Sequence, residues 1–513
     1  MQRIEFTAKN FFWSTISSVV SAVLGFVSRT IFLSSLGIEY LGLNSLFINV
    51  IAMLSLSELG IGVAINYSLY KPIAENDIER IKSLMHFYKR AYRYIGCIVT
   101  GIGLGVMLFL PYIVKDSGGI RNLYVIYLIF LFNAAYSYLF SYKRTLLAAD
   151  QKTYRLTMID MVVNMATATL QMLMLLLFKR YLIYLLISVG IGIIQNIYIN
   201  RYINKTYPYL LDKQIARLSK KDRSGLMKNI KALMLHKIGD LCVFQTDSII
   251  ISSFINITMV GVISNYTLLI NTVNRFVSNA INAANASLGN IIAVENSEKQ
   301  KAIFRKYDFL AFWIYSWSAL CFYFLINPFI TLWLGNSMVL DQRTVGMALI
   351  NFYILGRRLP IDNIKSAAGA YRQDKYVPMI ESLINLVSSI IAVRYLGVFG
   401  VYLGTFLSSI LPAVYKPMVV YRHVFHSDVR EYFLSYMKYA LVLMANVLVV
   451  SLFIRFLVPA EVTVASFVVR GLTCLVLPNL FMYAIYRRTE EFKYIINLLT
   501  IITLKRRSPG LNG

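Results

Sequence analysis

The sequence has few acidic residues, few histidines and few cysteines, and each shortage excludes a class of site. Its 513 residues include 25 Asp and Glu against 51 Lys and Arg, with four His and four Cys. No two cysteines form a C-x-x-C pair, so we expect neither a metal site nor a disulfide framework. The sequence also lacks a G-x-x-x-x-G-K-[ST] loop and a D-x-D motif. We therefore expect no cofactor, no ATP-driven transport within this chain and no metal-dependent glycosyltransferase.

Hydrophobic residues make up 58% of the chain, and the mean hydropathy is +0.61. Long apolar runs recur throughout, which is typical of a polytopic all-α membrane protein. Fourteen segments are long enough to span a bilayer: 11–36, 42–70, 91–114, 121–143, 156–178, 181–203, 231–254, 259–292, 307–333, 344–371, 376–394, 397–421, 433–456 and 464–486. The net charge of +26 does not indicate nucleic-acid binding, because the basic residues cluster in short loops between these segments.

Basic residues concentrate in the loops on one side of the predicted membrane. The loop after the sixth segment carries Arg201, Lys205, Lys213, Arg217, Lys220, Lys221, Arg223, Lys228 and Lys231. The loops after the second and fourth segments and the C-terminal tail are also basic, whereas the opposite side has few such residues. Because positively charged loops stay in the cytoplasm, both termini are predicted to be cytoplasmic.

A basic linker and a weak internal repeat divide the chain. We predict a six-helix lobe over 1–203, a cytoplasmic linker over 204–230, a second six-helix lobe over 231–421 and two further helices with a tail over 422–513. Thr30–Ser35 is similar to Ser248–Ser253, and each is followed by a glycine and a serine, with Gly42 and Gly261 as the glycines. Both copies lie in segments that run outward, so the repeat is parallel, with its axis along the membrane normal.

The eighth segment carries a polar stripe along one side. Its members are Asn271, Asn274, Arg275, Ser278, Asn282 and Asn285. Steps of one, three and four residues place them on one helical face. Arg275 falls near the bilayer midplane, where a cation costs roughly 2.5–3.5 kcal/mol on insertion scales. Such a stripe lines a water-filled pathway or forms a polar seam between helices. We favour a pathway, with Arg275, Asn271, Asn274 and Asn282 as substrate-binding groups.

Further charges fall near the middle of other segments. Arg357 and Arg358 lie in the tenth segment with Asp362 one turn later, and Glu58 lies in the second segment. Each is also a possible structural ion-pair partner, as Glu58 is for Arg275. The three midplane arginines outnumber the two midplane acids. A cavity between these helices is therefore expected to attract anions, and the planar arginine fork suits phosphate in particular.

Arg29 and Asp247 lie at matching depths in the first and seventh segments. Their opposite charges predict a contact that forms and breaks as the protein changes conformation. We assign Arg29, Arg357 and Arg358 to the substrate-binding cavity, and we assign gating or ion pairing to Asp247, Glu58 and Asp362.

Three runs within the first 80 residues carry a resemblance to a known family: Leu36–Asn44 (LGIEYLGLN), Leu54–Gly62 (LSLSELGIG) and Tyr70–Asp77 (YKPIAEND). The chain resembles the polysaccharide exporters of the multidrug/oligosaccharidyl-lipid/polysaccharide (MOP) superfamily, and most of all the Wzx-type flippases for O-antigen and capsule repeat units. The number of segments, the linker and the parallel halves agree with this resemblance.

The resemblance implies two six-helix lobes around a central cavity, in the bacterial cytoplasmic membrane. It implies alternating access that moves an undecaprenyl-pyrophosphate-linked oligosaccharide outward, without enzymatic activity. The implied partners are this lipid-linked oligosaccharide, membrane lipids and polysaccharide polymerase machinery, and proton or sodium coupling stays open. Relatives that flip the peptidoglycan precursor have cavity arginines on the first, second and eighth helices. Arg29 and Arg275 fall in comparable segments, but the second segment offers Glu58 and no arginine.

Two other functions compete with the flippase. A MATE-type multidrug cation antiporter shares the implied fold, but it is expected to carry acidic residues in the first lobe, where this chain offers Arg29. A membrane glycan polymerase or transferase would need long outer loops, and the predicted outer loops are short.

Overall fold

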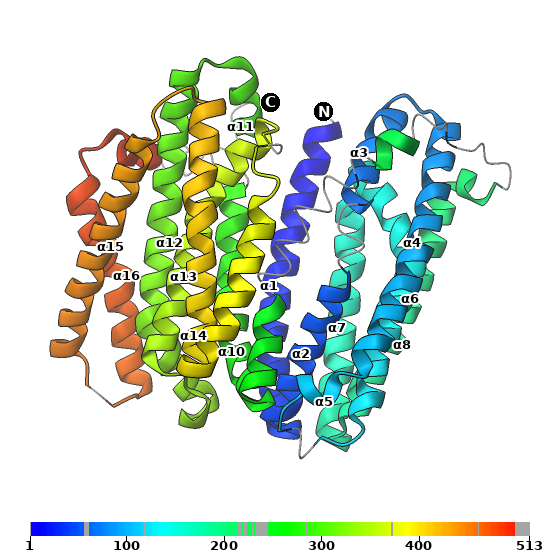
Figure 1. Ribbon diagram of the computed structural model, residues 1–513, viewed down its shortest axis with the longest axis horizontal. Helices are drawn as coiled ribbons and strands as arrows, with labels where there is room; N and C mark the ends of the chain where they lie inside the picture. The colour runs from blue at the N-terminus through cyan, green and yellow to red at the C-terminus, as the bar shows by residue number, and fades with distance from the viewer. Residues whose placement is uncertain are drawn as a thin grey trace, which may run out of the picture. The chain divides into compact units, whose positions relative to one another are not determined.

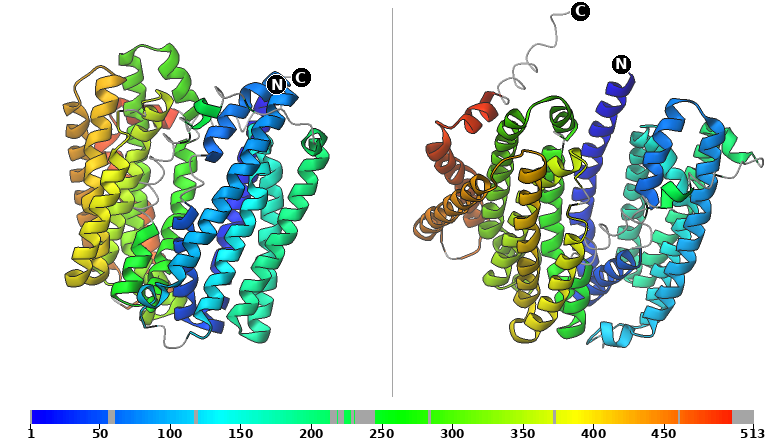
Figure 2. Two further views of the ribbon diagram at one scale, coloured as in Figure 1. Left: turned by 45° about the vertical axis from the view of Figure 1, so that its right-hand side comes forward. Right: turned by 45° about the horizontal axis from the view of Figure 1, so that its top comes forward.

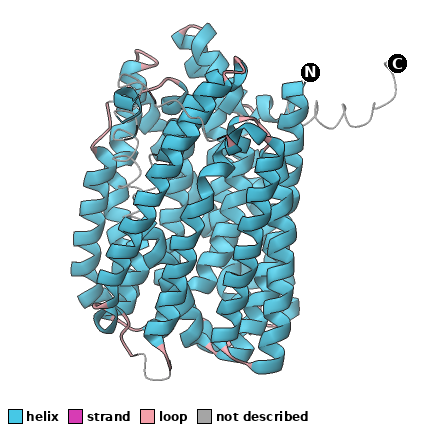
Figure 3. Cartoon of the chain, turned by 90° about the vertical axis from the view of Figure 1, so that its right-hand side faces the viewer, coloured by secondary structure: helices cyan, strands magenta, loops and turns pink. Residues whose placement is uncertain are grey.

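The computed structural model describes residues 2–55, 61–116, 120–212, 218, 223–227, 230, 245–282, 285–370, 373–459 and 461–497. Within these ranges the chain consists of helices joined by turns, without a strand (Figure 3). Eight of the described helices are long and apolar enough to cross a membrane by length and composition. The prediction of an all-α multi-pass membrane protein is confirmed.

The chain divides into two compact units, each with its own packing. Unit 1 comprises Met1–Leu268 and Pro378–Val401, and unit 2 comprises Leu269–Val377 and Tyr402–Gly513. Two helices contribute to both units: α10 (Ile257–Asn282) and α14 (Val377–His423). The lobe boundaries predicted at 203, 230 and 421 were drawn from the linker and the sequence repeat. They are not the limits of these two units, and they stay a prediction.

Unit 1 contains the N-terminal helices. They are α1 (Gln2–Leu36), α2 (Ile38–Leu54), α3 (Ile61–Ala74), α4 (Ile78–Met107), α5 (Leu110–Ile113), α6 (Leu123–Ala149), α7 (Thr153–Phe178), α8 (Tyr181–Thr206), the 3-10 helix η2 (Pro208–Leu211) and an unlabelled helix over 245–254. Helix α1 packs against α7, and α6 packs against both α4 and α8 (Figure 1). The predicted second segment corresponds to α2 and α3, between which 56–60 lie outside the described residues.

Unit 2 is built around one long helix. Its remaining elements are α11 (Asn285–Val294), α12 (Ser297–Leu334), the 3-10 helix η3 (Asn336–Met338), α13 (Gln342–Ala367), α15 (Arg430–Leu457) and α16 (Val464–Tyr486). Helix α12 packs against α13, α15 and α16 (Figures 1 and 2). Asn296 starts α12 by accepting a hydrogen bond from the Lys299 amide at 3.0 Å. Aromatic rings fill the core beside this helix, with Phe304, Phe312 and Tyr315 almost completely buried.

The predicted boundary between the eleventh and twelfth segments falls at a break within α14. Gly397 has φ 58° and ψ −136°, outside the helical region, and only glycine adopts such angles readily. A Cβ atom at Gly400 would lie 2.3 Å from the carbonyl oxygen of Ala392. The backbone at Gly400 therefore packs closely against that at Ala392, as the short turn predicted at Tyr395–Gly397 requires.

The two copies of the sequence repeat contact each other within unit 1. A Cβ atom at Gly42 would lie 2.1 Å from the carbonyl oxygen of Ile257, and one at Gly261 would lie 2.5 Å from that of Ile38. Gly42 corresponds to Gly261 in the repeat, and Ile38 corresponds to Ile257 at the same spacing. The contact is thus reciprocal, as a two-fold relation between the copies requires. Small residues at the crossing allow α2 and α10 to approach this closely.

Candidate functional site

The part of α10 that belongs to unit 2 has one apolar and one polar face. Val277 and Ile281 belong to the core of unit 2, and Leu269 and Val273 line a cavity against α12. The polar residues occupy an arc of about 100° on the other side of the helix, given 3.6 residues per turn. The predicted stripe therefore faces away from the core of its own unit.

Most of the polar face is open. Asn271, Arg275 and Asn282 are exposed, and Asn274 and Ser278 are half-buried. Within the described ranges no carboxylate lies within ion-pair distance of Arg275. Glu58, the partner considered for Arg275, lies outside the described residues, as do the side chain of Asn285 and residues 283–284 that precede it.

Hydrogen bonds hold the edges of this polar face in place. The Tyr315 hydroxyl donates to Asn274 Oδ1 at 3.0 Å, and Tyr315 itself is packed against Gly356, where a Cβ atom would lie 2.1 Å from the ring. Asn363 Nδ2 donates to Asn282 Oδ1 at 3.0 Å. Helices α12 and α13 thereby fix the orientation of the two amides, which reduces the entropy lost when they bind a ligand.

Arg357 lies inside the core of unit 2, unlike Arg275. Its side chain is 1% exposed, and its Nη2 donates to Asp308 Oδ2 at 2.8 Å. The guanidinium also lies 5.7 Å from the ring centroid of Tyr436 and 5.2 Å from that of Tyr439. The prediction that Arg357 binds substrate does not fit this conformation, because its charge is neutralised and enclosed. Asp308 escaped notice because α12 begins at Ser297, ten residues before the predicted segment, and this places Asp308 three turns inside the helix.

Arg358 and Asp362 belong to a second group of charges on α13. Asp362 Oδ1 lies 2.7 Å from Lys416 Nζ and 4.0 Å from Lys365 Nζ. The cavity that Arg358 lines has a volume of only about 10 Å³, which is room for one water molecule. Asp362 is thus paired with lysines, and its predicted gating or ion-pairing role stays a prediction.

Arg29 donates from Nη1 to the Ser264 hydroxyl at 2.7 Å, within unit 1. The predicted contact between Arg29 and Asp247 stays a prediction. Ser264 is the serine that follows Gly261 in the repeat, so Arg29 of one copy contacts the second copy. The observed partner of Arg29 thus lies in the eighth predicted segment, whereas the sequence paired Arg29 with Asp247 of the seventh.

Two sets of polar contacts in unit 1, around Arg144 and around Lys143, were not predicted from the sequence. Arg144 forms a two-pronged ion pair with Asp160, at 3.1 and 2.9 Å, and Gln195 donates to the same carboxylate at 2.7 Å. Lys143 donates to the side-chain oxygens of Asn200 and Asn204. Lys143, Arg144 and Asp160 lie near the ends of predicted segments, where charge is ordinarily attributed to topology. Among the described residues no cluster of His, Cys, Asp or Glu is placed to hold a metal ion.

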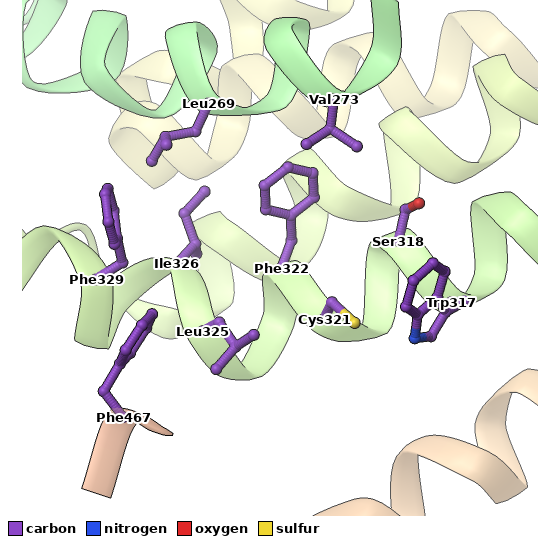
Figure 4. Close-up of a pocket in the computed structure, with 10 residues that line it drawn as sticks. All are labelled: Leu269, Val273, Trp317, Ser318, Cys321, Phe322, Leu325, Ile326, Phe329 and Phe467. Atoms are coloured by element: carbon purple, nitrogen blue, oxygen red, sulfur yellow. The ribbon is translucent and has the colours of Figure 1, made fainter. Parts of the chain in front are cut away.

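An apolar cavity of about 270 Å³ lies on the other face of α10. Leu269 and Val273 point toward Ile326 and Phe322 of α12, and Phe467 of α16 closes one end (Figure 4). Its lining offers almost no hydrogen-bonding groups, so it suits a hydrocarbon chain and not a sugar or a phosphate. Helix α10 thus separates a polar surface from an apolar one.

Solved structures with the same fold are membrane transporters. The chain is similar to the lipid II flippase MurJ in an inward closed conformation, with a TM-score of 0.63, 15% identity, and coverage of 94% of this chain and 99% of that one. An inward-facing multidrug resistance MATE family transporter of the MOP superfamily gives a TM-score of 0.59 at 14% identity, covering 77% of this chain and 94% of that one. A mutant form of the Vibrio cholerae MATE transporter VcmN gives a TM-score of 0.54 at 15% identity, covering 83% of this chain and 97% of that one.

A family match covers much more of the chain than its first 80 residues. No curated protein matches the sequence significantly. Residues 7–285, more than half of the chain, match the family described as "Polysaccharide biosynthesis protein". Together with the fold shared with MOP-superfamily transporters and flippases, this match establishes that the chain is a multi-pass membrane protein that belongs to the polysaccharide biosynthesis protein family.

Proposed function

We propose that this protein is a flippase for an undecaprenyl-pyrophosphate-linked oligosaccharide. It moves the repeat unit of an O-antigen or capsule outward across the bacterial cytoplasmic membrane by alternating access, with both termini in the cytoplasm. The observation that carries the proposal is the exposed polar face of α10, on which Arg275 has no carboxylate partner among the described residues. The family match and the fold shared with MurJ support it.

The pyrophosphate is the part of such a substrate that most needs the protein. Its polyprenyl tail can stay in lipid, but bare phosphate charge in hydrocarbon has a desolvation cost of many kcal/mol. An arginine at midplane depth offsets that cost, and its planar fork matches two phosphate oxygens at once. Asn271 and Asn282 lie on the same face as Arg275, and their amides can donate to and accept from sugar hydroxyls.

The experiment that tests this function replaces Arg275. Arg275→Ala should abolish surface glycan while lipid-linked repeat units accumulate in the membrane and the protein level stays normal. Arg275→Lys should retain part of the activity, because it keeps the charge and loses the fork. Arg455→Ala is a matched control, since Arg455 is exposed in the last turn of α15, away from the polar face, and it should export normally.

Two results would overturn the role of Arg275. One is normal glycan export by Arg275→Ala. The other is recovery of export in the double variant Glu58→Gln with Arg275→Gln, because recovery would mean that Arg275 only balances Glu58.

A MATE-type cation antiporter is the second candidate, because MATE transporters share the fold. Deletion of the gene separates the two candidates. Accumulation of undecaprenyl-linked repeat units supports the flippase, whereas sensitivity to cationic drugs with normal glycan export supports the antiporter. Short unpolymerised glycan at the cell surface would instead indicate a polymerase.

A further inference from the structure

A second polar cavity lies in unit 1, between the ends of α4, α6 and η2. Its volume is about 60 Å³, and its lining residues are Lys82, Met85, His86, Lys89, Tyr142, Lys143, Tyr209 and Leu210. A buried water needs about 10–15 Å³ on this scale, so the space accommodates several waters or one phosphate group. Three of the eight lining residues are lysines, and none is acidic.

Lys143 is one of two almost completely buried cations in this lining, together with Lys82. Its residue is 8% exposed, and its Nζ donates to Asn204 Oδ1 at 2.6 Å and to Asn200 Oδ1. An ammonium group has three donors, so one remains for the cavity that Lys143 lines. No carboxylate within the described ranges lies within ion-pair distance of it. A buried lysine whose partners are neutral amides leaves its charge uncompensated.

The other lining groups add to this positive charge. Lys82 is neutralised by Glu79 at 2.6 Å and Asp212 at 2.9 Å, but Lys89 forms no ion pair in the part of the chain described. Lys89 and Lys143 line the same cavity, where their like charges disfavour each other. Burial, and then the charges of Arg90, Lys89 and Arg93, lower the pKa of His86. The cavity therefore has a surplus of positive charge that a bound anion would relieve.

We propose that this cavity binds a phosphate group, held by Lys143 and Lys89. The two ammonium groups donate to phosphate oxygens, and the cavity size fits one such group. The positive-inside rule accounts for lysines in the loops after the second and fourth predicted segments. It does not account for a buried lysine at a cavity whose lining has no acid. The phosphate comes from a phospholipid headgroup at the membrane surface or from a soluble phosphate compound. The proposal does not depend on the transport function or on Arg275.

The test measures phosphate binding to the purified full chain in dodecyl maltoside, a detergent without phosphate. One arm titrates radiolabelled orthophosphate by equilibrium dialysis, and the other adds phosphatidylglycerol and counts retained lipid by native mass spectrometry. Lys143→Met and Lys89→Met should each weaken binding about tenfold or more. Lys89 is exposed, so its variant tests the site even if Lys143→Met folds poorly. Lys71→Met is the matched control, because the Lys71 side chain is 77% exposed outside the cavity.

The two arms identify the source of the phosphate. Orthophosphate binding that Lys89→Met weakens and Lys71→Met leaves unchanged supports a soluble ligand, and the same pattern with phosphatidylglycerol alone supports a headgroup. The proposal is overturned if the wild-type protein binds neither probe. It is also overturned if Lys71→Met and Lys89→Met reduce binding equally.

Discussion

Arg275 and Arg357 lie at similar depth in their predicted segments, but the structure gives them opposite surroundings. Arg357 is enclosed by aromatic rings and paired with Asp308, whereas Arg275 is exposed on the polar face of α10. Both belong to unit 2. The difference teaches that depth in a membrane does not assign a role to a charge. The role depends on the direction in which the helix presents the charged side chain, because that direction decides whether protein or ligand neutralises the charge.

The largest effect is expected from breaking the buried pair. Asp308→Ala leaves Arg357 charged and unpaired in the core, which should cost about 3–5 kcal/mol in the free energy of unfolding. Unfolding of the purified protein in mixed micelles, followed by circular dichroism, measures this cost. The double variant Asp308→Leu with Arg357→Met should recover most of it, because a buried pair can often be replaced by apolar residues of similar size.

A cost below about 1 kcal/mol for Asp308→Ala would be incompatible with an unpaired charge in a closed core. Arg357 would then have access to water, and its surroundings would no longer differ from those of Arg275.

An intermediate effect is expected where the polar face meets the core. Tyr315→Phe removes the hydroxyl that donates to Asn274 at 3.0 Å and should cost about 0.5–1.5 kcal/mol in the free energy of unfolding. Tyr323→Phe on the same helix is the control, because the Tyr323 hydroxyl forms no hydrogen bond within the described ranges. Equal effects of the two changes would show that the bond to Asn274 does not stabilise the fold.

The smallest effect on stability is expected at Arg275. Arg275→Ala should change the free energy of unfolding by no more than about 0.5 kcal/mol, as is usual for exposed positions without packing contacts. Loss of glycan export with unchanged stability would separate its role from that of Arg357. A stability loss as large as that of Asp308→Ala would mean that Arg275 is also a structural cation.

Much of the fold could be predicted because hydrophobicity and helix signals are local. The last predicted segment, 464–486, coincides with α16, and the reversal at Gly397 lies where the sequence places a short turn. The start of α12 was missed because most of its first ten residues are polar or charged and precede the apolar run. Because the predicted segment began at 307, Asp308 stood at its edge and was not considered as a partner of Arg357.

The sequence by itself determined the membrane class, nearly all of the helices, the repeat and the polar face of α10. These follow from the composition and spacing of neighbouring residues along one helix. The partners of charged groups were decided by tertiary structure alone. Arg29 meets Ser264, Arg357 meets Asp308, and Lys143 meets Asn200 and Asn204. Each pair joins different helices, and the packing of side chains that brings two helices together has no signature within either one.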